Sequence, residues 1–233
     1  DLASFAPVRE NIEAQWFVDG KDVFEAMIED IKAAKKHVYL SFWIFVPTIY
    51  VTRGDSPERL DDILKAKADE GVQIRILLWD ETNMAMSNNS KWNKHYVESL
   101  SENIVVVRHP PFRPLRWSHH QKFVVIDDEV GYAGGVDFAT GRYDWHEHLI
   151  SDPQKEHWWG VDYYAPLVQK AESFEDPDRD WVDQSKVTRM PWHDIQMRVT
   201  GLAARDLAYN FGNQLSLSPS LTFQFKDGTT TLP

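Results

Sequence analysis

The sequence predicts an α/β protein, an α-β-α sandwich in which helices flank a mostly parallel mixed sheet. Amphipathic segments with helical spacing alternate with β-branched, apolar segments between residues 21 and 108. Strands joined through helices run parallel with right-handed crossovers, and the helices cover the sheet. With 233 residues, of which 42% are hydrophobic, the chain is long enough for one domain with a sizeable core.

Three helix–strand pairs account for the first half of the chain. Each predicted helix has apolar side chains one turn apart, and each strand is rich in Val, Ile, Leu or aromatic residues. We expect Asp19 to cap the first helix and Ser56 with Pro57 to begin the second. The predicted pairs are 21–36 with 37–45, 57–70 with 72–79, and 91–101 with 104–108.

The second half of the chain centres on a short apolar strand, Phe123 to Ile126. Asp127 to Glu129 interrupts it as a turn, and residues 130–135 return as a second strand that ends in a glycine pair. Residues 151–186 show no clear periodicity. A further strand over 195–199 and a helix over about 202–211 follow.

One polar constellation stands next to this central strand, in the pattern H-x-K-x-x-x-x-D. It consists of His120, Lys122 and Asp127. Residues two apart on a strand share one face, so the imidazole and the ammonium should lie together. The alternative is a plain hairpin with a surface histidine and lysine. A cation beside a neutral imidazole favours a phosphate site.

Composition restricts the possible functions. The formal net charge is -11 and the pI about 5.2, which argues against a nucleic acid as the main partner. The chain has no cysteine, which excludes disulfides and thiolate metal sites and fits a reducing compartment. The longest apolar stretch, 38–51, is too short to span a bilayer and contains a serine and a proline.

Several motifs together resemble the first HKD half of a eukaryotic-type phospholipase D. H-Q-K-F-V-V-I-D at 120–127 is followed by G-G-V-D-F from Gly134 and G-R-Y-D from Gly141. Further similarities are F-A-P at 5–7 with Arg9 and Glu10, E-H at 147–148, P-W-H-D at 191–194 and A-A-R-D at 203–206. The resemblance covers roughly residues 5 to 211 and is specific to the lipid-hydrolysing branch of the superfamily.

This resemblance implies a fold, a domain division and a set of site residues. The fold is the α-β-α sandwich of the phospholipase D/nuclease superfamily. Residues 1–211 would be the N-terminal catalytic half, and 212–233 a divergent C-terminal tail. The catalytic residues implied are His120, Lys122 and Asp127. The supporting residues implied are Gly135, Asp137, Arg142, Asp144 and Glu147.

The chemistry implied is attack of a neutral His120 imidazole on a phosphodiester, giving a phosphohistidine and releasing the alcohol. Lys122 would neutralise the phosphoryl oxygens, and Asp127 would fix the local backbone and the lysine. Asp137, Asp144 and Glu147 are candidates for holding the His120 tautomer. The scheme requires no metal or other cofactor.

No second H-x-K occurs in the chain, although the resembled enzymes take their general acid from a second motif. His119 is a poor substitute, because it should point to the opposite face. Three explanations remain open: an N-terminal portion of a longer enzyme, a homodimer with a composite site, or an inactive truncation.

The leading hypothesis is a cytoplasmic phospholipase D domain, peripheral at membranes, with phosphatidylcholine-like substrates and a second HKD half as partner. The proline-rich loop 109–117 either enters a lipid interface through Phe112, Leu115 and Trp117 or is a solvated connection. The alternatives are a single-motif homodimeric phosphodiesterase or nuclease and an inactive lipid- or partner-binding fragment.

Overall fold

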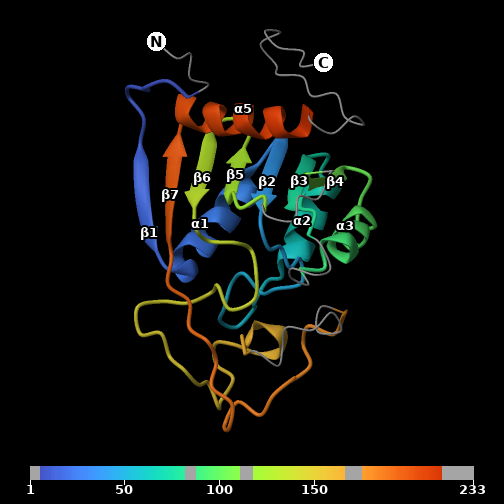
Figure 1. Ribbon diagram of the computed structural model, residues 1–233, viewed down its shortest axis with the longest axis vertical. Helices are drawn as coiled ribbons and strands as arrows, with labels where there is room; N and C mark the ends of the chain where they lie inside the picture. Colours follow the sequence, from blue (N-terminus) through green and yellow to red (C-terminus); the bar gives the residue numbers. More distant parts are fainter. Residues whose placement is uncertain (1–5, 82–87, 111–117, 166–174, 217–233) are drawn as a thin grey trace.

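The computed structural model describes residues 6–81, 88–110, 118–165 and 175–216. Within these ranges one sheet has the strand order β1-β7-β6-β5-β2-β3-β4 (Figure 1). Its strands are β1 (Ala14–Val18), β2 (His37–Phe42), β3 (Gln73–Trp79), β4 (Ile104–His109), β5 (Phe123–Ile126), β6 (Val130–Gly134) and β7 (Ile195–Thr200). The helices are α1 (Gly20–Ala33), α2 (Leu60–Asp69), α3 (Ser90–Glu98), the short 3₁₀ helix η1 (Gly160–Asp162) and α5 (Leu202–Ser216).

The α/β class and the mixed sheet are confirmed, but the sheet is not mostly parallel. Only β2–β3 and β3–β4 run parallel. The pairs β1–β7, β6–β7, β5–β6 and β2–β5 are antiparallel. The parallel pairs are those whose connection contains a helix, α2 or α3. A tight hairpin joins β5 to β6 instead, and a hairpin makes its two strands antiparallel.

Helices cover both faces of the sheet, as predicted. The larger core cluster includes Phe24 and Ile28 of α1 and Leu64 of α2, packed with Val38 and Leu40 of β2. On the opposite face a smaller cluster joins three side chains of α5 to side chains of β2, β3 and β5. This second cluster includes Tyr39, Leu77, Phe123, Val125, Ala208, Phe211 and Leu215. Because both faces are buried, β2 and β5 are apolar along nearly their whole length.

The predicted turn between β5 and β6 is confirmed as a tight hairpin. Asp127 and Asp128 have positive φ angles of 53° and 61°, and the Glu129 N–H donates to the Ile126 carbonyl at 2.9 Å. Positive φ at both central residues is the feature of a type I′ turn, whose twist matches that of the strands it joins. Aspartate tolerates this conformation better than most residues.

Three predicted helix ends are corrected. Helix α1 ends at Ala33 rather than Lys36, and α2 begins at Leu60, with Arg59 and not Ser56 at its N-cap. Asp19 occupies the N-cap position of α1, but its side chain makes no capping hydrogen bond. In these cases tertiary contacts outside the helix decide where the backbone departs from helical geometry.

The sequence analysis missed β1 and ended α5 too early. Strand β1 is at the edge of the sheet, and of its five residues only Phe17 is buried, so its apolar alternation is weak. Helix α5 continues to Ser216 because Leu215 is buried against the sheet. The predicted boundary between residues 211 and 212 therefore falls inside a helix.

Several sequence predictions concern residues outside the described ranges. These are the motif residue Phe5, the apolar residues Phe112, Leu115 and Trp117, and the tail 217–233. Of the helices within the described ranges, none has the length and apolar character needed to cross a bilayer.

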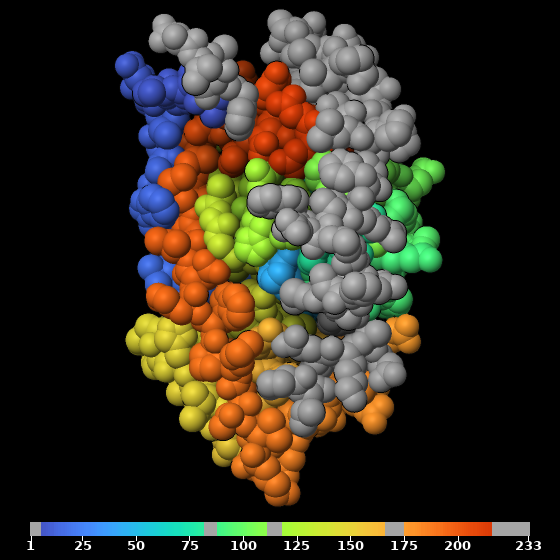
Figure 2. Space-filling view, in the orientation of Figure 1, coloured from blue at the N-terminus to red at the C-terminus, as the bar shows by residue number. Residues whose placement is uncertain are grey.

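Long irregular segments between β6 and β7 extend beyond one end of the sheet (Figure 1). In Figure 2 the yellow segment after β6 and the orange segment before β7 lie against each other there. Backbone hydrogen bonds join them: the Met190 N–H donates to the Tyr164 carbonyl at 2.7 Å, and the Arg189 N–H to the Ile150 carbonyl at 2.9 Å. These two segments carry most of the polar side chains described next.

Candidate active site

The H-x-K pair lies at the start of β5, the middle strand of the sheet. His120 and Lys122 precede the first strand residue, Phe123, and lie beside the residues that follow β2. The His120 ring centroid is 4.5 Å from that of Trp43, and Lys122 Nζ is 5.1 Å from the Trp43 ring. Both side chains therefore contact the same indole, which agrees with their predicted placement on one side of the chain.

Lys122 is buried and paired with Asp137. Nζ lies 3.2 Å from Asp137 Oδ2, but the angles do not make a hydrogen bond, so the ammonium protons remain available. The other Asp137 oxygen accepts the N–H groups of Trp43 and Ile44, at 3.0 and 3.1 Å. Burial lowers the pKa of Lys122 and raises that of Asp137, and the ion pair opposes both shifts. Asp137 thus positions the lysine rather than the His120 tautomer.

Arg142 adds a second buried cation, with a relative exposure of 2%. Its guanidinium carbon lies 3.7 Å from the Trp192 ring centroid, and Nη1 donates to the Thr140 carbonyl at 3.0 Å. Nε has no hydrogen-bond partner, and no carboxylate in the described part of the chain pairs with Arg142. The Arg142 charge acts on Asp137 without forming an ion pair with it. A buried cation with a free donor atom is costly, so this arrangement favours an anion nearby.

His120 is exposed, and its environment favours the neutral imidazole. Partial burial lowers its pKa, and the Lys122 charge lowers it further, while the carboxylates Asp137 and Asp194 act in the opposite direction. A neutral imidazole near pH 7 is available as a nucleophile or a base. The neighbouring His119 is different: burial lowers its pKa to about 3, and its Nε2 lies 2.8 Å from Ser41 Oγ.

Asp194 is a carboxylate that the sequence analysis did not select, although it belongs to the quoted P-W-H-D segment. It lies against Gly135, where a Cβ atom would come within 1.8 Å of Asp194 Oδ1. Trp192 Nε1 donates to Asp194 Oδ2 at 3.2 Å. The cluster of polar residues directly before strand β7 is the sequence feature that could have identified Asp194 as a candidate. Gly135 therefore serves the site by leaving room for this carboxylate.

Asp127 lies at the opposite end of β5 from Lys122. Its carboxylate accepts the backbone N–H groups of Lys35, Lys36 and His37 at 2.8, 2.8 and 2.9 Å. This geometry matches the predicted role of fixing the local backbone. It does not match the predicted contact with the lysine, since Lys122 pairs with Asp137 instead.

Asp144 and Glu147, the other candidates for holding His120, have different partners. Buried Asp144 pairs with Arg189 at 2.8 Å and accepts the Trp192 N–H at 2.8 Å. Glu147 is exposed, and its carboxylate lies 3.3 Å from His146. Asp144 therefore connects the segment after β6 to the segment before β7, and its role is to support Trp192 and, through it, Arg142.

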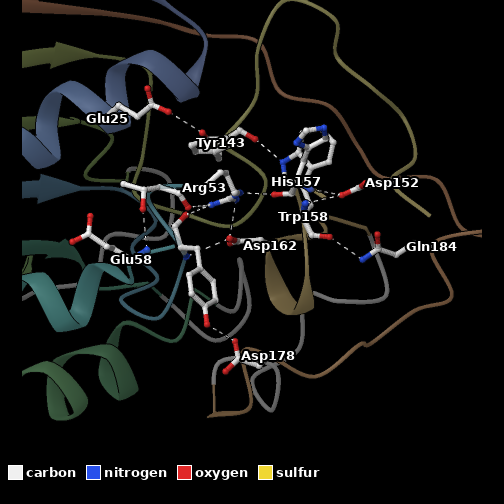
Figure 3. A network of polar contacts seen from close by, with 12 residues as sticks. Glu25, Arg53, Glu58, Tyr143, Asp152, His157, Trp158, Asp162, Asp178 and Gln184 are labelled. Atoms are coloured by element: carbon white, nitrogen blue, oxygen red, sulfur yellow. Dashed lines mark hydrogen bonds and ion pairs between the residues drawn. The ribbon is translucent and has the colours of Figure 1, made fainter. Parts of the chain in front are cut away.

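A polar network that includes Arg53, Tyr143 and Trp158 fixes the backbone directly after Arg142 (Figure 3). Arg53 pairs with buried Asp162 at 3.0 Å and lies 4.0 Å from the centroid of the Tyr143 ring. The Tyr143 hydroxyl donates to Glu25 at 3.0 Å, and its carbonyl accepts Trp158 Nε1 at 2.6 Å. Tyr143 directly follows Arg142, so these contacts restrict where the buried guanidinium can lie.

The fold and these residues define a class of protein, an α/β domain with a candidate phosphoryl-transfer site at the end of the central strand of a mixed sheet. The chain belongs to the phospholipase D family, whose profile matches residues 30–226. It is 45% identical over 209 residues to phospholipase D A of Dictyostelium discoideum, covering 88% of this chain and 16% of that protein.

Other comparisons agree. The chain is 39% identical over 220 residues to phospholipase D zeta 2 of Arabidopsis thaliana, covering 90% of this chain and 21% of that protein. It thus spans 16% and 21% of the length of these two relatives. Among solved structures, NucT from Helicobacter pylori aligns with a TM-score of 0.51 at 11% identity, covering 88% of this chain and 96% of that one. This last similarity concerns the fold alone.

Proposed function

We propose that this chain is the first-motif half of a phospholipase D-type phosphodiesterase. The reaction proposed is hydrolysis or transphosphatidylation of glycerophospholipids such as phosphatidylcholine, giving phosphatidic acid or its ester and the free head-group alcohol. The setting proposed is the cytoplasmic side of a membrane surface, to which the domain binds peripherally. Membership of the family and the site geometry support this proposal.

The observation that carries the proposal is a pair of buried cations with free donor atoms beside an exposed, neutral imidazole. Lys122 and Arg142 are buried with free donor atoms, and one carboxylate, Asp137, pairs with Lys122. A phosphodiester anion would supply the missing negative charge and accept those donors. His120 would then be next to the phosphorus.

The proposed reaction has two steps. A nitrogen of His120 attacks phosphorus and forms a P–N bond, while the bond from phosphorus to the head-group oxygen breaks. Lys122 and Arg142 stabilise the charge on the phosphoryl oxygens. The leaving oxygen takes a proton from a general acid outside this chain, in the second motif half. Water or another alcohol then attacks phosphorus and gives its proton to the same group of the second half, which has lost its proton and now acts as the base. The P–N bond breaks, and His120 is released.

Replacing the nucleophile tests the proposal. In this chain assembled with a second-motif half, His120→Asn should reduce choline release from phosphatidylcholine vesicles to background while thermal unfolding stays unchanged. His146→Asn is the matched control, because the His146 side chain is 85% exposed. Near-normal turnover by the His120 variant would contradict the role given to this residue.

Replacing the lysine tests the phosphate-binding role separately. Lys122→Arg should also abolish turnover, because a planar guanidinium cannot take the place of a compact ammonium packed against Trp43 and Asp137. Lys21→Arg, at a half-exposed lysine on α1, is the control and should be silent.

One observation favours a second candidate, a homodimeric phosphodiesterase with a composite site: the chain carries a single H-x-K. Its formal net charge of -11 argues against a nucleic acid substrate in that case too. Assaying one preparation on phosphatidylcholine vesicles and on single-stranded DNA separates the two candidates. Cleavage of DNA with no choline release would support the second. Activity on neither substrate, even after a second-motif half is added, would indicate a lipid- or partner-binding fragment.

A further inference from the structure

Three side chains of types that bind metal ions lie close together beside the candidate active site. They are Asp19 between β1 and α1, His148 in the segment after β6, and His193 just before β7. One ligand atom from each lies within 4.8 Å of the other two. Asp19 Oδ1 is 2.7 Å from His193 Nδ1, and Asp19 Oδ2 is 3.4 Å from His148 Nε2.

The Asp19 carboxylate is turned toward the histidines at the expense of its usual role. An aspartate at an N-cap position normally accepts a hydrogen bond from the first turn of its own helix. Asp19 makes no such bond, has a φ of 68°, and is only 3% exposed. Its carboxylate instead faces His148 and His193, with one long contact, 3.4 Å, from the Asp194 N–H. Its contact with His193 Nδ1 is a hydrogen bond, so this carboxylate already has an imidazole as its nearest partner. A positive φ outside glycine is strained and persists only where the surroundings hold it in place.

His148 has the environment of a metal-bound histidine. Its Nε2 faces Asp19, and its Nδ1 lies 3.5 Å from buried Asp144 Oδ2 without forming a hydrogen bond. Asp144 is itself held by Arg189 and by the Trp192 N–H. A carboxylate behind the second nitrogen of a ligating histidine is the usual arrangement around protein-bound zinc, because it orients the ring and raises its basicity.

We propose that Asp19, His148 and His193 bind one divalent transition-metal ion, with zinc preferred. Two imidazole nitrogens and one carboxylate oxygen suit zinc and its neighbours in the transition series, whereas magnesium and calcium prefer oxygen ligands throughout. The His193 side chain is 71% exposed, which leaves a fourth position open to solvent. The sequence analysis expected no metal, because the reaction it proposed requires none.

The proposed ion has a structural role beside the phosphate site. His193 lies between Trp192, which stacks on Arg142, and Asp194, which packs against Gly135. Metal ligation would fix this three-residue segment to the start of α1 and to the segment after β6. The ion takes no part in the proposed transfer of the phosphoryl group.

Metal binding by the purified chain, stripped with a chelator, tests this inference without any activity assay. Titration with Co²⁺ should give one equivalent of tightly bound metal with the intense visible absorption of a four-coordinate site, and Zn²⁺ should displace it. Zn²⁺ should also raise the midpoint of thermal unfolding. His193→Ala should abolish these effects, and Asp144→Asn should weaken binding by about 10–100-fold.

His146→Ala is the matched control, since this exposed histidine lies two residues from His148 and pairs only with Glu147 among the described residues. It should bind Co²⁺ as the wild-type chain does. Circular dichroism checks that His193→Ala is folded, which its exposed side chain leads us to expect. Absence of a four-coordinate cobalt spectrum, or equal binding by the two variants, would overturn the proposal. Neither outcome bears on the role of His120.

Discussion

At the scale of single residues, the candidate site combines two buried cations, each next to a tryptophan ring. Lys122 and Arg142 are both buried, Asp137 pairs with the first, and Arg142 has no carboxylate partner in the described ranges. The same positive charge acts on His120, whose pKa is lowered. The same environment therefore favours the neutral form of the His120 imidazole, as the proposed attack on phosphorus requires.

The lowered pKa of His120 predicts the acid limb of the pH–rate profile. Because the neutral imidazole attacks, activity of a competent assembly should fall as pH drops through the pKa of His120, and this midpoint should lie below the ordinary histidine value of about 6.5. Lys122, Asp137 and Asp194 are the charged groups that influence this titration. Choline release measured from pH 4.5 to 8 checks this prediction. A midpoint of the acid limb at or above about pH 6.5 would contradict the assignment.

At the scale of elements, the β5–β6 hairpin and helix α5 hold β5 in place. The hairpin turn contributes Asp127, whose carboxylate ties the end of α1 and the start of β2 to β5. Helix α5 covers the opposite face, where Phe211 stacks on Tyr39 with ring centroids 4.9 Å apart. The position of the H-x-K pair thus depends on contacts from elements distant in sequence.

Asp127→Asn should lower the free energy of unfolding by about 1–2 kcal/mol at pH 7, because a neutral amide is a weaker acceptor for three N–H groups. Burial raises the pKa of Asp127, but the hydrogen bonds from His37, Lys35 and Lys36 outweigh it, so the folded-state pKa is lowered. The stabilisation is therefore fully present above the unfolded value of about 3.9 and is lost as pH falls through the folded pKa.

Urea unfolding at pH 7 and at about pH 3 measures this difference, and Glu129→Gln in the same turn is the control. Glu129 is exposed, and its carboxylate lies 4.0 Å from Lys36, so its substitution should have little effect at either pH. If the free energy of unfolding of Asp127→Asn differs from that of wild type by the same amount at both pH values, the carboxylate charge does not cause the stabilisation.

Phe211→Ala should destabilise the fold by about 3–5 kcal/mol, since the side chain is fully buried between α5 and the sheet. Loss of its contacts with Tyr39 and Phe123 should loosen α5. Thermal unfolding measures the loss, and Tyr209→Ala on the partly exposed side of α5 is the comparison. Similar losses in both variants would mean that Phe211 has no special place in the packing.

At the scale of the whole molecule, the chain carries one H-x-K motif, which supplies the proposed nucleophile, and no second one. Acid–base assistance to a leaving alcohol is typically worth about a hundredfold to ten-thousandfold in rate. The match covers only 16% and 21% of the length of two relatives, which are therefore much longer than this chain. We therefore expect the site to be completed by another chain segment or another copy.

The isolated chain should accordingly be nearly inactive as a monomer. Mixing it with a separately expressed second-motif half should raise choline release by about a hundredfold or more, because the general acid is then present. The control is the same mixture with His120→Asn in this chain. Full activity from a sample shown by sedimentation to be monomeric would disprove the requirement for a second acid.

The sequence by itself determined the class of fold, most strands and helices, and the pairing of His120 with Lys122, because these depend on local spacing and apolar periodicity. It also identified the turn at Asp127 from residue type alone. It could not give the strand directions, since these depend on which connection crosses the sheet and which forms a hairpin.

Only the tertiary structure decided which carboxylate serves which cation. Asp137 pairs with Lys122, Asp194 lies against Gly135, and Asp144 supports Trp192. It likewise turned Asp19 away from its helix and toward His148 and His193. The physical reason is that these contacts join residues separated by between 15 and 174 positions in the sequence. No local pattern of residues encodes which of several acidic side chains will be buried beside a given partner.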